Sequence, residues 1–144
     1  MHYRQLPASL KPLADKFYRN QRSAMRAAAG AQLWVAEDRD ILAALCLHPV
    51  EHGHWLTSLL VDSTRQGQGI ARQLIETALL DCPAPVWLFC HPQLSDFYLR
   101  LGFAPCTDLP QPLAERLRRY QRSKNLLAFV RVPSSSLTAQ GLEP

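Results

Sequence analysis

Hydrophobic and polar residues in the first half of the chain follow the two-residue period of β-strands. Residues 2–6 predict a short strand, while Leu33–Glu37 and Ile41–Leu47 predict a hairpin around the acidic turn Asp38–Asp40. In His54–Asp62, successive side chains fall alternately into two sets, as on the two faces of a strand, and this segment predicts the next strand. We therefore expect a group of neighbouring strands in this part of the chain.

Two segments follow the helical period instead. From Ser9 to about Gly30 the spacing predicts one or two helices, with an apolar stripe formed by Leu10, Leu13, Phe17 and Met25. Ile70–Leu79 repeats apolar residues every three to four positions and predicts a second helical region. This region stops at Pro83, since proline cannot continue a helix.

The second half of the chain predicts strands and helices in alternation. The expected elements are a strand at Val86–Cys90, a short helix from Pro92 through Leu101 closed by Gly102, a strand at Phe103–Cys106, a basic helix around Leu113–Arg122 and a strand at Leu126–Val132. In the basic helix, Leu113, Leu117 and Tyr120 are expected to pack inward and the arginines to point outward. The order of elements predicts a mixed sheet with helices on both faces, in one domain over residues 1–132. A Ser- and Pro-containing tail covers 133–144.

The formal net charge is +4, and the basic residues gather at the two ends of the chain. Residues 1–26 hold six Lys or Arg against one acid, whereas residues 27–108 hold four against nine. This distribution suits a polyanionic cofactor held between basic ends, and it also suits a nucleic acid. Because no aromatic residues interleave the basic ones and no known motif is present, we expect no nucleic-acid partner.

No apolar run reaches the roughly 18–20 residues that a membrane span needs, and the first residues form no signal-peptide pattern. We therefore expect a cytoplasmic protein without a membrane partner. The four cysteines include no Cys-x-x-Cys pair, which favours reduced thiols over disulfides or zinc. His48, His52 and His54 fall in one short segment that is typical of a solvated turn, so no metal is expected.

The most informative segment joins the strand His54–Asp62 to the helix that begins at Ile70. It reads Gln66-Gly67-Gln68-Gly69-Ile70-Ala71, with two glycines where a ligand would approach the backbone. The unpaired N–H groups and positive end of the following helix would hold an anion the size of a pyrophosphate. The segment fits neither a Walker loop nor a dinucleotide fingerprint, and a plain strand-to-helix turn remains the alternative.

This segment resembles the cofactor motif of the GCN5-related N-acetyltransferases, Gln/Arg-x-x-Gly-x-Gly/Ala, at every fixed position. A second landmark of that family, an aromatic pair followed by Gly-Phe, is present as Phe97-Tyr98-Leu99-Arg100-Leu101-Gly102-Phe103. The resemblance covers residues 3–132. It implies an α/β (α+β) fold with a mixed, mostly antiparallel sheet of six to seven strands, helices on both faces and a splayed central strand pair.

The resemblance also implies acetyl-CoA as the cofactor. Its pantetheine would pair with the strand backbone at Leu59, Leu60 and Val61, and its pyrophosphate would bind the N–H groups of Gln66, Gly67, Gln68, Gly69, Ile70 and Ala71. Arg65 or Arg72 would add positive charge. One position departs from the family: His91 stands where many members carry Asn, and we expect it to cap a helix or to lie beside the cofactor.

For catalysis, the resemblance assigns Tyr98 as the proton donor to the departing sulfur, because a phenol with a pKa of about 10 stays protonated at neutral pH. The backbone N–H of Leu60 or Val61 would stabilise the oxyanion. The general base is left open between His54, Glu51 and deprotonation by bulk water.

The predicted function is therefore transfer of an acetyl group from acetyl-CoA to a primary amine of a small molecule or a protein. The alternative is a non-catalytic acyl-CoA-binding module that regulates a partner. The oligomeric state is expected to be a monomer or homodimer. The basic helix is either a solvated face or a guide for an acidic acceptor.

Overall fold

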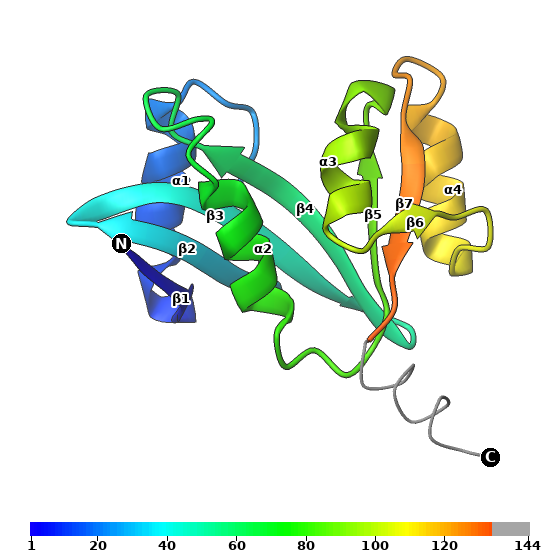
Figure 1. Cartoon of the computed structure of the whole chain (residues 1–144), viewed down its shortest axis with the longest axis horizontal. Helices are drawn as coiled ribbons and strands as arrows, with labels where there is room; N and C mark the ends of the chain where they lie inside the picture. Colours follow the sequence, from blue (N-terminus) through cyan, green and yellow to red (C-terminus); the bar gives the residue numbers. More distant parts are fainter. Residues whose placement is uncertain (134–144) are drawn as a thin grey trace. The chain divides into compact units, whose positions relative to one another are not determined.

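The computed structural model describes residues 1–133, which form an open sheet of seven strands in the order β1-β2-β3-β4-β5-β7-β6 (Figure 1). The predicted tail lies, from residue 134 on, outside the described residues. The elements are β1 (His2–Leu6), η1 (Ala8–Leu10), α1 (Lys11–Asn20), β2 (Gln32–Asp38), β3 (Asp40–Val50), β4 (Gly53–Val61), α2 (Ile70–Leu79), β5 (Val86–Cys90), η2 (Pro92–Leu94), α3 (Ser95–Arg100), β6 (Ala104–Pro105), α4 (Gln111–Tyr120) and β7 (Leu127–Arg131). The predicted mixed seven-stranded sheet is confirmed.

Two compact units share this sheet, and β4 contributes to both. The first unit comprises residues 1–49 and 56–81, and the second comprises residues 50–55 together with the chain from residue 82 onward. The expectation of one domain over 1–132 stays a prediction. Within residues 1–133, no helix is long and apolar enough to cross a membrane.

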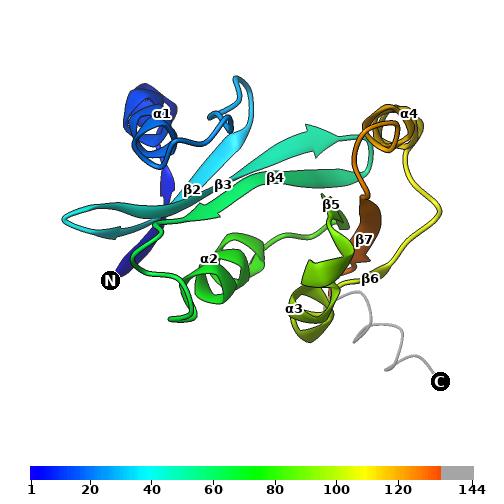
Figure 2. The same cartoon turned by 90° about the horizontal axis from the view of Figure 1, so that it is seen from above.

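In the first unit, β1 and β3 both pair antiparallel with β2. The helices α1 and α2 lie on opposite faces of these strands (Figure 2). All six residues of β3 from Leu42 to Leu47 are buried, because both faces of the strand are covered. The predicted hairpin is therefore confirmed, and its strands are longer than the apolar pattern indicated.

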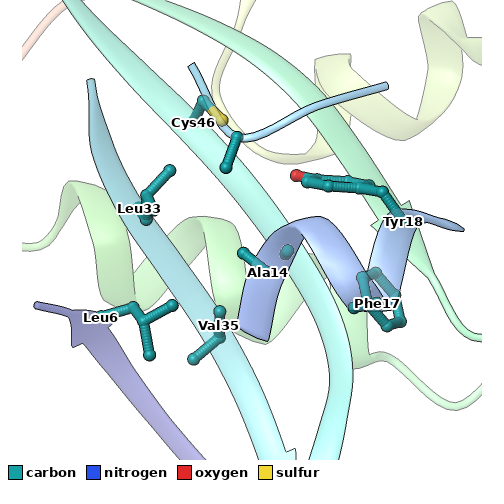
Figure 3. Packing of buried hydrophobic residues seen from close by; sticks show 9 residues of the cluster. Leu6, Ala14, Phe17, Tyr18, Leu33, Val35 and Cys46 are labelled. Atoms are coloured by element: carbon teal, nitrogen blue, oxygen red, sulfur yellow. The ribbon is translucent and has the colours of Figure 1, made fainter. Parts of the chain in front are cut away.

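The buried face of α1 coincides with the predicted stripe only in part: Phe17 is buried, and Leu10 packs partly buried against the same cluster. Ala14, Phe17 and Tyr18 pack into a cluster with Leu6, Leu33, Val35 and Cys46 (Figure 3). Leu13, which the predicted stripe includes, is 47% exposed. The rings of Phe17 and Tyr18 contact each other, and this aromatic pair determines which side of α1 packs against the strands.

The helix predicted to continue to about Gly30 is wrong beyond Asn20. Arg22 adopts a left-handed backbone with φ of +56°, and the N–H of Ser23 bonds to the carbonyl of Tyr18 at 3.1 Å, which ends the helix. The carboxylate of Asp15 then accepts the N–H of Ala27 at 2.9 Å. These contacts hold the alanine-rich segment 24–29 in an extended path despite its helical propensity.

In the second unit, β5 pairs antiparallel with β7, and it pairs parallel with β4 at His54–Val86 and Trp55–Trp87. The helices α3 and α4 lie on opposite sides of β5 and β7 (Figure 2). Tyr98 of α3 packs its ring against Phe103 and Phe129, with centroids 5.7 and 6.5 Å away. This aromatic cluster is the core of the unit.

The C-terminal elements follow the predicted order with shifted limits. The predicted strand Phe103–Cys106 is confined to the two residues of β6, and the basic helix α4 begins and ends two residues earlier than expected. Leu113 is buried, and the other two stripe residues are half-buried. Arg116 is exposed, as predicted, and its guanidinium also lies 5.0 Å from the ring centroid of Trp55.

Tyr18→Phe tests the polar contact of α1 with β4. The Tyr18 hydroxyl donates to the backbone carbonyl of Ser58 at 2.7 Å, and its side chain is 1% exposed. Removing the hydroxyl leaves the carbonyl without this donor, so we expect the free energy of unfolding to fall by about 1–3 kcal/mol in denaturant titrations. Tyr120→Phe is the matched control, because the hydroxyl of Tyr120 accepts a hydrogen bond of 3.3 Å from the exposed side chain of Arg116. Equal stability of the Tyr18 variant and wild type would contradict the assigned role.

Candidate cofactor and active site

The loop that follows β4 is held by a network around Asp62. Its carboxylate accepts the backbone N–H of Thr64 at 2.8 Å and the side-chain amide of Gln21 at 3.1 Å. The same Gln21 accepts the N–H of Ser63 at 3.0 Å. The hydrogen bond from the Thr64 hydroxyl is the main reason that the pKa of Asp62 lies below its ordinary value. The loop is therefore fixed at its first three residues before the glycines begin.

Both glycines of the loop have left-handed backbones, with φ of +78° at Gly67 and +77° at Gly69. A β-carbon at either position would meet no atom within 4 Å, so the loop faces open space. Gly69 is the residue before α2 and has no side chain to cap the helix. The two glycines thus allow a turn that would strain other residues, and they leave the backbone of the loop uncovered by side chains.

The first turn of α2 presents unpaired backbone donors. The N–H of Arg65 bonds to Asp62 at 2.9 Å, and that of Gln73 bonds to Gly69 at 3.0 Å. Between them, residues 66 and 67 form a further turn, and the N–H groups of Ile70, Ala71 and Arg72 in the first turn of α2 have no intrahelical acceptor. These donors, at the positive end of a ten-residue helix, fit a phosphate or pyrophosphate group.

Side-chain charge contributes less to this site than the sequence suggested. Arg65 lies 3.7 Å from the carboxylate of Asp38, in an ion pair that directs its guanidinium to the β2–β3 turn. Arg72 is exposed on α2. The backbone N–H groups are therefore the main donors that the first unit offers to an anion.

The strand β4 contains one backbone irregularity. Ser58 has φ of +57°, in the left-handed region, in the middle of the strand. Its carbonyl points to α1, where it accepts the hydroxyl of Tyr18. The three residues predicted to pair with pantetheine, Leu59, Leu60 and Val61, follow directly and are half-buried. The change of backbone direction at Ser58 sets the orientation of the peptide groups that follow it.

Tyr98 lies on α3 in the second unit and is 6% exposed. Burial raises the pKa of its hydroxyl well above the ordinary tyrosine value, and the neighbouring Cys90 thiol raises it further. The hydroxyl is therefore protonated throughout the neutral range. Rings of Phe97, Phe103 and Phe129 fix the position of the phenol.

The residues considered for the general base lie at the β3–β4 turn and the start of β4. Glu51 and His52 contact each other at 3.4 Å and have side-chain exposures of 74% and 85%. The Nδ1 atom of His54 is 3.6 Å from the sulfur of Cys82. His91 precedes η2 and is exposed, and its side chain makes no capping hydrogen bond. The helix-capping role considered for His91 is therefore wrong as far as its side chain is concerned.

The three-histidine segment is not a single turn. Only His52 belongs to the turn, whereas His48 lies in β3 and His54 in β4. The ring of His48 makes a 2.7 Å contact from Nε2 to the hydroxyl of Thr57 on β4. Sequence reasoning missed this pair, because the strand boundary that separates the two residues from the turn is set by hairpin pairing. Among residues 1–133, no three potential ligand side chains gather around a metal position.

Comparison with known proteins identifies the family. The family model described as "Acetyltransferase (GNAT) domain" matches residues 29–105. The chain belongs to the GNAT acetyltransferases. No curated protein matches the chain significantly. The match spans the hairpin, β4, the glycine loop and the aromatic landmark around Tyr98.

Solved structures share the GNAT fold at low sequence identity. A GNAT-family acetyltransferase from Staphylococcus aureus Mu50 is 15% identical, with a TM-score of 0.67 over 91% of this chain and 98% of that one. The ribosomal-protein-S18-alanine N-acetyltransferase from Escherichia coli is 16% identical, with a TM-score of 0.67 over 91% and 92%. Rv2747 from Mycobacterium tuberculosis, solved in complex with coenzyme A, is 16% identical, with a TM-score of 0.66 over 92% and 99%. The predicted family and fold are thus confirmed, and the membership supports acetyl-CoA as the cofactor.

A proline substitution tests the backbone donors of this GNAT protein. Ala71 is the second residue of α2, and the chain already carries proline at the second position of α1 and α4, as Pro12 and Pro112. Ala71→Pro therefore removes one N–H that has no acceptor in the fold, at a position where helices tolerate proline. Losing one charge-assisted hydrogen bond of about 1.5–3 kcal/mol should weaken acetyl-CoA binding by about ten- to hundredfold.

The measurement is the rise in melting temperature that acetyl-CoA produces. The unliganded variant should melt near the wild type, and its acetyl-CoA shift should shrink or vanish. Gln68→Ala is the control, because it changes an exposed side chain and leaves every N–H in place. Substitution of Gly69 is less informative, since an L-residue at φ of +77° strains the backbone. An undiminished shift in Ala71→Pro would remove this N–H from the site.

Proposed function

We propose that this protein is an N-acetyltransferase that uses acetyl-CoA and acetylates a primary amine of a small molecule or a protein. The observation that carries the proposal is the glycine loop, with left-handed Gly67 and Gly69, followed by the unpaired N–H groups in the first turn of α2. This donor set fits the pyrophosphate of coenzyme A in number and in charge. We place the activity in the cytoplasm, where acetyl-CoA is available.

The binding residues act through the backbone. The N–H groups of the glycine loop hold the pyrophosphate, and the peptide groups of Leu59, Leu60 and Val61 pair with the amides of the pantetheine arm. Pairing of this kind requires an extended strand, and β4 is extended on both sides of Ser58. His91, exposed before η2, is proposed to lie beside the cofactor rather than to take part in the reaction.

Acetyl-CoA supplies a thioester whose acetyl carbon forms a new bond to the amine nitrogen while the carbon–sulfur bond breaks. Tyr98 donates its phenolic proton to the departing sulfur and regains a proton from water. The backbone N–H of Leu60 or Val61 donates to the carbonyl oxygen as it gains negative charge. Since burial raises the pKa of Tyr98, the proton donor remains available at neutral and mildly alkaline pH.

The decisive experiment measures thiol release from acetyl-CoA with a panel of amines. Suitable probes are spermidine, tobramycin, lysine ethyl ester and a peptide with an N-terminal alanine, the last because one structural relative is named for that substrate. We expect thiol release with at least one amine, matched by an equal amount of acetylated product in mass spectrometry. An acetyl-CoA melting shift without thiol release across the panel would instead favour a non-catalytic regulatory module.

Tyr98→Phe tests the proton donor. The substitution keeps the ring and its contacts with Phe103 and Phe129 but removes the hydroxyl. We expect kcat to fall by roughly 10- to 1,000-fold, in or near the range that general-acid groups supply, with little change in the acetyl-CoA melting shift. Tyr120→Phe, at the surface of α4 in the same unit, serves as control and should keep full activity. Full activity in Tyr98→Phe would mean that water or another group protonates the thiolate.

A further inference from the structure

A second polar cluster lies in the first unit, outside the glycine loop. It consists of the Tyr18 hydroxyl, the Cys46 thiol, the His48 ring, the Thr57 hydroxyl and the Ser58 carbonyl. Tyr18 and Cys46 are buried, whereas His48 and Thr57 are half-buried, so the polar atoms of the last two lie where the core meets the surface.

The cluster lies on the face of the sheet that carries α1. Cys46 is fully buried in the same cluster as Tyr18 and lies 3.8 Å from the carbonyl of Arg26 (Figure 3). His48 is two residues further along β3, so its side chain leaves the same face of the strand as Cys46. Unlike Cys46, His48 is only half-buried, which leaves it accessible to a substrate.

Thr57, the partner of His48, lies further along β4 than the general-base candidates that the sequence suggested. Thr57 is two residues before Leu59, the first residue proposed to bind pantetheine, and a strand covers about 7 Å in that span. His54 lies five residues before Leu59 on the same strand, and Glu51 precedes the strand. A general base must come within hydrogen-bond reach of the reacting nitrogen, directly or through one bridging group. Of these candidates, the His48–Thr57 pair lies nearest along the chain to the segment proposed to bind pantetheine.

We propose that His48 and Thr57 together form the general base that takes the proton from the acceptor amine, an inference that rests on the proposed acetyl transfer. The amine N–H proton passes to Oγ1 of Thr57 as the new carbon–nitrogen bond forms. The Thr57 hydroxyl proton passes in turn to Nε2 of His48, 2.7 Å away. The imidazolium then releases that proton to water, which restores the pair. The acceptor enters this step as a neutral amine, and it gives up one N–H proton to the relay so that the amide product is uncharged.

The ordering contacts around the pair support the relay. Ser58, next to Thr57, is fixed by the Tyr18 hydroxyl, so the strand cannot rotate Thr57 away from His48 without breaking a buried hydrogen bond. The proton-accepting atom is therefore held on a rigid element rather than on a loop.

The experiment uses the full chain and whichever amine of the panel gives the fastest thiol release. His48→Gln keeps an amide donor near Thr57 but has no basic nitrogen, so we expect kcat to fall about 100-fold with an unchanged KM for acetyl-CoA and an unchanged acetyl-CoA melting shift. Thr57→Val should show the same loss, whereas Thr57→Ser, which retains the hydroxyl, should keep most of the activity. His52→Gln, on the exposed turn, is the matched control and should behave as the wild type.

A chemical rescue distinguishes proton transfer from a structural role. His48→Ala should be as inactive as His48→Gln, and added imidazole should restore part of its kcat without changing its melting temperature. Wild-type rates in His48→Gln, or failure of imidazole to rescue His48→Ala, would overturn the inference while leaving the proposed function intact. Absence of thiol release by the wild-type protein with every amine would overturn both.

Discussion

The hydrogen bond from Tyr18 to the Ser58 carbonyl is the interaction on which the first unit depends most. It joins α1 to the middle of β4 at a residue whose backbone is left-handed, a conformation that costs a non-glycine residue of the order of 1–3 kcal/mol. A buried tyrosine offsets that cost, because its only polar atom must find an acceptor. The strand on either side of Ser58 stays extended, which is the condition for pairing with a ligand chain.

The proposed anion site relies mainly on backbone groups. The first turn of α2 offers its N–H groups, Arg65 is paired with Asp38, and Arg72 is exposed on the helix. Helix dipole and N–H groups give directional binding that salt screens less than an exposed arginine, since the donors touch the ligand. The acidic middle of the chain is therefore compatible with an anionic ligand.

The groups proposed for binding and for chemistry belong to both compact units. The first unit carries the glycine loop, the strand segment after Ser58 and the His48–Thr57 pair, whereas the second carries Tyr98 in an aromatic cluster. The two kinds of group have different requirements. Backbone donors need an open, exposed loop, while a proton donor that must remain protonated benefits from burial, which raises its pKa.

Sequence alone determined most of the elements, the glycine loop and the aromatic landmark. These features are local: Gly67 and Gly69 mark a turn whatever surrounds it, and the apolar periods of β5 and α2 fall within one element. Prediction from the sequence failed where the local structure depends on residues that are distant in the chain. The helix ends at Asn20, where the Ser23 N–H bonds back to Tyr18, and the bond from the Ala27 N–H to Asp15 holds the following alanines outside a helix despite their propensity. The pair His48–Thr57 and the bond between Tyr18 and Ser58 join residues 9 and 40 positions apart. Their partners are chosen by strand register and helix packing, which no local pattern of residues encodes.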